Sequence, residues 1–124
     1  MIGYTTVGSN DLARAGSFYD ALFESLGAKR LFEADTFIAW GRDMQSPGFS
    51  VAKPFDGNPA TVGNGVMIAL AMQNPDAVAA LHALALRLGA SDEGAPGDRG
   101  NGFYAAYFRD LDGNKLNAFC QLKD

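Results

Sequence analysis

The sequence is poor in the residues that build reactive or metal-binding centres. Among its 124 residues there are one cysteine, one histidine and one tryptophan. A single cysteine excludes a disulfide within the chain. No apolar run approaches the roughly 18 residues that a membrane-spanning helix needs. The first ten residues, MIGYTTVGSN, lack the basic and apolar regions of an export signal. We therefore expect a cytoplasmic protein with no membrane partner.

Positive charge is also scarce. Ten Lys and Arg residues face 14 Asp and Glu residues, which gives a formal net charge of −4 and no basic stripe. A nucleic-acid partner is therefore not expected. Hydrophobic residues make up 48% of the chain, enough to fill a core and to exclude intrinsic disorder. The length predicts a single domain over 1–124. The 15 glycines predict many tight turns.

Apolar spacing predicts short strands and two amphipathic helices in an α+β fold. The expected strands cover 2–8, 29–33, 36–42, 49–53, 66–72, 103–109 and 116–122, and the expected helices cover 11–26 and 74–88. Residues 91–102, rich in glycine and acids, are expected to hold at most a short edge strand. Turn-forming residues over 55–65 predict a linker between one module at about 1–54 and a second at about 66–124.

The two halves repeat the same order of elements. Asn10 or Asp11 is expected to cap the first helix, with Asn10 matched to the cap Asn74 of the second, and Leu26-Gly27-Ala28 recurs as Leu88-Gly89-Ala90. The stretch 39–43 (AWGRD) is matched with 106–110 (AYFRD), which makes Trp40 equivalent to Tyr107. The pattern predicts a tandem βαβββ duplication.

Two segments carry a resemblance to a known family. The first is IGYTTVGSNDLARAGSFYDALFESLGA, which carries Ser17-Phe18-Tyr19 on its expected helix, and the second is RDLDGNKLNAF, which contains the turn 110–114. Both resemble segments of the vicinal oxygen chelate superfamily. That family includes glyoxalases, extradiol dioxygenases, fosfomycin-resistance transferases and bleomycin-resistance proteins. The resemblance implies two βαβββ modules whose sheets form a cup, with helices outside and a ligand or divalent metal inside.

The family's metal positions fall on poor metal donors here. The first-strand ligand, usually His, falls on Tyr4. The metal ligand on the strand that opens the second half of the chain, also usually His, falls on Met67 or its neighbour Gly65. The last-strand Glu falls on Asn117. Divalent ions prefer imidazole or carboxylate donors to a phenol, a thioether or a neutral amide. We therefore expect no metal and no other cofactor.

Strand alternation and the resemblance together give a set of residues expected to line the cup. They are Tyr4, Thr6, Trp40, Met67, Tyr107, Arg109, Asn117 and Phe119, with Ala69 and Arg42 beside them. Such a lining suits a flat apolar or aromatic molecule. Alternatively, Trp40 and Phe119 are core residues, and Arg42 and Arg109 stabilise turns through nearby acids.

Two other single residues have structural interpretations. His82 is expected on the second helix, partly exposed and away from the cup, with no acidic neighbour at ligand spacing. Cys120 is expected to be a small buried apolar residue, because no basic group nearby would activate it as a nucleophile.

Three functions remain open from the sequence. The first is a metal-free protein that binds a small planar or apolar molecule, as bleomycin-resistance proteins do. The second is a glyoxalase- or dioxygenase-like enzyme, a lyase or oxidoreductase with a non-standard metal or none. The third is a structural or partner-binding domain. A homodimer is expected, since the resemblance implies modules that pair and a small aromatic-rich domain has surface to cover.

Overall fold

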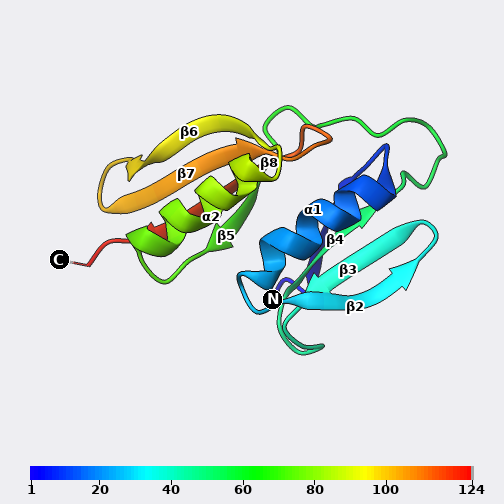
Figure 1. Cartoon of the computed structure of the whole chain (residues 1–124), viewed down its shortest axis with the longest axis horizontal. Helices are drawn as coiled ribbons and strands as arrows, with labels where there is room; N and C mark the ends of the chain where they lie inside the picture. Colours follow the sequence, from blue (N-terminus) through cyan, green and yellow to red (C-terminus); the bar gives the residue numbers. More distant parts are fainter. Residues whose placement is uncertain (124) are drawn as a thin grey trace. The chain divides into compact units, whose positions relative to one another are not determined.

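The computed structural model describes residues 1–123 as two compact units, one over Met1–Gly63 and one from Asn64 onward. Each unit contains one helix and one four-stranded sheet (Figure 1). The α+β class and the tandem βαβββ order are as the sequence predicts. The cup that the resemblance implies stays a prediction.

The first unit has the strand order β1-β4-β3-β2. Its elements are β1 (Tyr4–Gly8), α1 (Leu12–Glu24), β2 (Lys29–Ala34), β3 (Phe37–Gly41) and β4 (Gly48–Ala52). Strand β1 pairs with β4 in parallel, and the other pairs are antiparallel. Helix α1 is capped by Asp11, whose side chain accepts a hydrogen bond from the Arg14 N–H. Of the two predicted caps, Asp11 is therefore the one used; Asn10 instead exchanges two hydrogen bonds with the Ala60 backbone.

The second unit repeats this plan with the order β5-β8-β7-β6. Its elements are β5 (Ile68–Ala71), α2 (Pro75–Arg87), β6 (Ser91–Asp98), β7 (Phe103–Arg109) and β8 (Lys115–Gln121). Helix α2 begins at the predicted cap Asn74. Strand β6 is longer than the sequence predicted, because its glycines accommodate two irregularities in the pairing with β7. It does lie at the sheet edge.

The predicted glycines follow shortly after the last residues of the two helices, Glu24 and Arg87. Gly27 has φ +74° and Gly89 has φ +106°, a left-handed conformation that glycine adopts without a steric penalty. The next residue in each case, Ala28 or Ala90, donates its N–H back to a helix carbonyl. The repeated Leu-Gly-Ala signal thus marks two equivalent helix ends.

The helix lies against one face of each sheet and the core fills that interface. In the first unit the core is aromatic, with Tyr19, Phe23, Trp40 and Phe49 in ring contact. In the second unit smaller side chains dominate, and they include Val78, Leu81, Ala85, Ala106, Leu116 and Ala118, with Phe108 as the large member. Cys120 is buried, as expected.

His82 is more buried than the sequence predicts, and it has an acidic partner. It is 6% exposed and its Nε2 lies 3.0 Å from Asp92 Oδ1 on β6. The sequence placed no acid near it because Asp92 approaches only when β6 folds beside α2. Hydrogen bonds from the Gly94 backbone N–H and from His82 lower the pKa of Asp92 below its usual 3.8.

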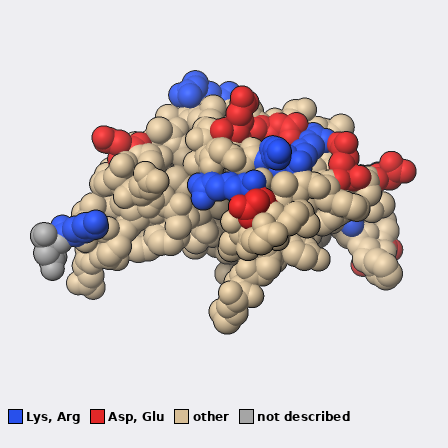
Figure 2. All heavy atoms as spheres, turned by 90° about the horizontal axis from the view of Figure 1, so that it is seen from below, with Lys and Arg blue, Asp and Glu red and all other residues tan. Residues whose placement is uncertain are grey.

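Charged side chains on the surface are of both signs. Figure 2 shows Lys and Arg side chains beside Asp and Glu side chains on one face of the molecule. Arg30 pairs with Asp20 and Glu33, and Arg109 pairs with Glu93. No helix within residues 1–123 is both long and apolar enough to cross a membrane.

Candidate functional site

The two faces of each sheet are distinguished by their helix contacts. Asp92 bonds to His82 of α2 and stands opposite Phe108, so Phe108 lies on the helix side of the second sheet. Because side chains alternate along a strand, Tyr107 lies on the other side. We call this other side of each sheet its helix-free face.

The helix-free face of the second sheet brings together several predicted ligand residues. Asn117 on β8 stands opposite Tyr107 on β7, and on its other side it stands opposite Ala69 on β5. Phe119 shares this face and stacks on Phe103, with ring centroids 5.5 Å apart. The face therefore combines aromatic rings with one amide.

Asn117 has an unusual environment. Its side chain is buried at 1% exposure, yet within residues 1–123 neither its Nδ2 nor its Oδ1 has a hydrogen-bond partner. Buried polar groups are nearly always paired, and an unpaired one costs about 1–3 kcal/mol. An amide offers both donors and an acceptor, so a ligand with a carbonyl or N–H group could satisfy it.

Tyr4 and Thr6 lie on the helix-free face of the first sheet. Tyr4 is 64% exposed and contacts Phe37 edge-on. Ser50 donates its hydroxyl proton to the Thr5 carbonyl at 2.9 Å, so the Thr6 hydroxyl donates to Ser50 at 2.6 Å. Thr6 and Ser50 are thus satisfied without a ligand.

Trp40 does not lie where the sequence placed it. It is 1% exposed on the helix side, and its ring packs against Tyr19 and Phe23 of α1. Its indole N–H donates to Asp20 Oδ1 at 2.9 Å. The prediction that Trp40 faces a ligand is therefore wrong, and the alternative interpretation as a core residue holds.

The error comes from a one-residue slip in the repeat. Trp40 stands opposite Arg30, which bonds to α1, and Phe108 stands opposite Asp92, which bonds to α2. Trp40 is therefore equivalent to Phe108 and not to Tyr107. A slip of one residue exchanges the faces of a strand.

The remaining predicted residues have other environments. Arg109 forms an ion pair with Glu93 and donates from Nη1 to the Gly113 carbonyl at 2.9 Å, so it stabilises a turn. Arg42 donates to the Leu26 carbonyl. Met67 precedes β5 and is 38% exposed.

Sequence reasoning missed two cations on the helix-free face of the second sheet. Lys115 Nζ lies 5.3 Å from the Tyr107 ring centroid, and Arg99 Cζ lies 5.4 Å from it. Lys115 opens β8, two residues before Asn117, so alternation along a longer strand would have found it. Arg99 lies in the glycine-rich stretch 91–102, where no alternation of apolar and polar residues predicts which face it occupies.

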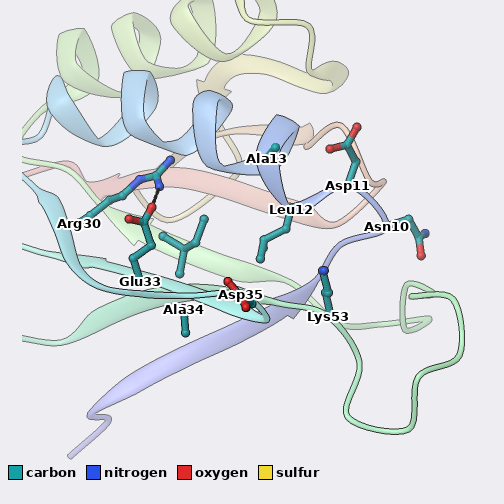
Figure 3. A pocket seen from close by; sticks show the side chains of 10 residues that line it. Asn10, Asp11, Leu12, Ala13, Arg30, Glu33, Ala34, Asp35 and Lys53 are labelled. Carbon is teal, nitrogen blue, oxygen red and sulfur yellow. Dashed lines mark hydrogen bonds and ion pairs between the residues drawn. The ribbon is translucent and has the colours of Figure 1, made fainter.

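An open hollow of about 610 Å³ lies in the first unit, between the start of α1 and the β2–β3 hairpin (Figure 3). Its lining includes charges of both signs, among them Asp11, Arg30, Glu33 and Lys53. Asp11 caps α1, and Arg30 is held by Asp20 and Glu33. Glu33 and Lys53 are exposed to water. Each of these four charged side chains is thus hydrogen-bonded, ion-paired or exposed to water.

A divalent metal does not fit the residues at the family positions. Tyr4, Met67 and Asn117 supply a phenol, a thioether and an amide, none of which is a good donor to such an ion. Residues 1–123 contain no group of three His, Cys, Asp or Glu side chains that could hold a metal. The chemistry of this donor set disagrees with the family's metal site.

The chain is similar to known proteins over nearly its whole length. Residues 1–118 match the model of the Glyoxalase/Bleomycin resistance protein/Dioxygenase superfamily. A glyoxalase/bleomycin resistance protein from Albidiferax ferrireducens T118 is 35% identical, with 98% of this chain and 99% of that chain covered and a TM-score of 0.89. Lactoylglutathione lyase from Agrobacterium tumefaciens is 18% identical, with 97% and 92% covered and a TM-score of 0.73, which shows a shared fold. Among curated proteins, none matches this chain.

Proposed function

Since the chain belongs to the Glyoxalase/Bleomycin resistance protein/Dioxygenase superfamily, we propose that it is a metal-free protein that binds a small planar molecule. The ligand lies on the helix-free face of the second sheet, against Tyr107, Asn117 and Phe119. The observation that carries the proposal is Asn117, a buried amide without a partner in residues 1–123.

The chemistry of the face supports a planar, largely apolar ligand. Tyr107 stands opposite Asn117 on the neighbouring strand, and Phe119 lies two residues after Asn117 on β8. Aromatic side chains favour stacked or edge-on contacts with other rings. The residues opposite Asn117 and Phe119 on the neighbouring strands, Ala69 and Ala105, have small apolar side chains. Binding sites commonly combine such an apolar lining with a few polar groups that fix orientation.

The absence of good metal donors at Tyr4, Met67 and Asn117 favours binding over the family's metal-dependent reactions. We therefore place the protein with the members that hold a molecule, as bleomycin-resistance proteins do. The neutral probe 2-naphthamide represents this ligand class, because it has a flat apolar body and an amide that Asn117 can pair with.

The test is a titration of ¹⁵N-labelled protein with 2-naphthamide in the presence of EDTA. We expect saturable shifts of the Asn117 side-chain NH₂ signals and of the backbone signals of Tyr107 and Phe119. Shifts that are absent, or that lie only in the first unit, contradict the proposal.

A matched pair of variants isolates the amide. Asn117→Leu should abolish the saturable shifts, because it keeps the size of the side chain and removes its donors and acceptor. Gln73→Leu makes the same kind of change at an exposed position between β5 and α2 and should leave binding unchanged.

A further inference from the structure

The cations beside Tyr107 carry an inference about the charge of the ligand. Resting on the proposed function, we infer that the second sheet binds a planar organic anion, with its carboxylate or similar group held by Arg99 and Lys115. The flat body of the same molecule then lies toward Asn117 and Phe119.

The two cations converge on one ring from different elements. Lys115 stands at the start of β8 and Arg99 in the turn after β6, yet both approach the Tyr107 ring, at 5.3 and 5.4 Å. Their charges therefore lie within about one Debye length of each other at 0.1 M salt. Neither forms an ion pair with an acid in the described part of the chain, residues 1–123.

Two glycines make the position of Arg99 possible. A Cβ at Gly97 would lie 2.9 Å from Arg99 Nη1, and a Cβ at Gly94 would lie 3.2 Å from Arg99 Nη2. The guanidinium thus lies across β6 on the side of Tyr107, where any larger residue would displace it. Its Nη2 also donates to the Ala95 carbonyl, and its backbone N–H donates to the Phe103 carbonyl.

The neighbouring acids do not neutralise this pair. Glu93 is engaged by Arg109. Asp92 bonds to His82 on the opposite side of the sheet. Asp98 accepts from the Gly100 N–H. Two like charges held near one ring repel each other, and an anion placed between them relieves that repulsion. Exposed cation–π contacts are worth only about 0.5–1 kcal/mol each, so the ring leaves both cations available to an anion.

Asn117 gives the second, independent indication of a ligand at this place. It is the cross-strand partner of Tyr107 and lies two residues from Lys115 on the same face of β8. A buried amide without a partner in residues 1–123 and two cations without acids therefore surround one aromatic ring.

The experiment compares 2-naphthoate with neutral 2-naphthamide by calorimetry and by the same NMR titration. At low salt we expect 2-naphthoate to bind about tenfold more tightly, a difference of about 1.4 kcal/mol. In 0.5 M NaCl the ratio should fall toward one, because partly exposed charges are screened.

Charge variants locate the anion. The double variant Arg99→Gln, Lys115→Gln should bring the ratio of the two affinities close to one, while its affinity for 2-naphthamide stays near that of the unmodified protein. Arg87→Gln and Lys29→Gln, combined, remove the same net charge at exposed positions on α2 and in the first unit, and should preserve the tenfold preference.

The outcomes separate this inference from the proposed function. Equal binding of both probes by the unmodified protein, or an unchanged ratio in the double variant, overturns the anion site and leaves the binding function standing. A preference lost equally in the control variant also overturns it, since net charge alone would explain the result. Failure of both probes to shift Asn117 overturns the inference together with the proposed function.

Discussion

The two modules share a scaffold and differ in what they place on it. In the first, Asp20 of α1 binds Arg30 of β2. In the second, His82 of α2 binds Asp92 of β6, and each pair is ten residues apart. Arg30 stands opposite Trp40, and Asp92 stands opposite its equivalent, Phe108. The acid is on the helix in one module and on the strand in the other. Both modules thus join helix and edge strand by a polar side-chain pair at an equivalent place, with the acid on opposite partners.

The helix-free faces differ in hydrogen bonding at one equivalent position. Ser50 in the first sheet stands opposite Thr6, and Asn117 in the second stands opposite Ala69. Thr6 satisfies Ser50, whereas Ala69 has no polar group to offer Asn117. The duplication therefore retains a buried polar residue at this position in both modules, and within residues 1–123 only that of the second module lacks a hydrogen-bond partner.

The largest expected effect concerns the aromatic core of the first module. Trp40→Ala should lower the free energy of unfolding by about 3–5 kcal/mol, because it removes a large buried side chain from the contact with α1. Urea unfolding measures the loss. At a temperature where the variant is folded, 2-naphthamide should bind normally. Near-normal stability with weak binding would return Trp40 to the ligand site.

A smaller effect is expected from Asp20, which bonds both to Arg30 and to the indole of Trp40. Asp20→Ala leaves the buried indole N–H of Trp40 without its acceptor and should cost about 1–3 kcal/mol. The matched change Asp92→Ala removes the partner of the buried His82 ring in the second module and should have a cost of the same order. In a Trp40→Phe background the cost of Asp20→Ala should shrink, because the indole N–H is gone. A cost of the same size in both backgrounds would exclude the indole contact as the cause.

The smallest effect is the dependence of stability on pH. Hydrogen bonding to Arg30 lowers the pKa of Asp20, and bonds from Gly94 and His82 lower that of Asp92. A lowered folded-state pKa contributes stability that is complete above the ordinary value of 3.8 and lost as pH falls through the folded-state value. Urea unfolding between about pH 5 and pH 2 should show this loss. The double variant Asp20→Asn, Asp92→Asn should lose less, and an identical loss would contradict the assignment.

Local signals in the sequence predicted most of the scaffold. Leu-Gly-Ala marked both helix ends, Asn74 marked the start of α2, and apolar periods located the helices and most strands. These signals act over a few residues, so one sequence suffices to find them. The length of β6 was missed because its irregular pairing breaks the two-residue period.

The site was predicted less completely because it depends on register and on tertiary contacts. The similarity of 39–43 to 106–110 suggested a register that is wrong by one residue. For this reason Trp40 was predicted to face a ligand. Alternation along the strand correctly placed Asn117 on the face away from the helix, but its burial without a partner within residues 1–123 depends on the tertiary fold. Arg99 approaches Tyr107 across Gly94 and Gly97, where an added Cβ would crowd its guanidinium group.

The most direct test of the account is the free energy of unfolding of Asn117→Leu. If Asn117 is kept unsatisfied for a ligand, then leucine removes a buried unpaired amide and should raise the free energy of unfolding by about 1–3 kcal/mol. Ser50→Ala, at the equivalent position of the first sheet, breaks satisfied hydrogen bonds and should lower it by about 1 kcal/mol. A fall in stability for Asn117→Leu, comparable with that of Ser50→Ala, would show that the amide is already satisfied in the folded protein and would contradict the account.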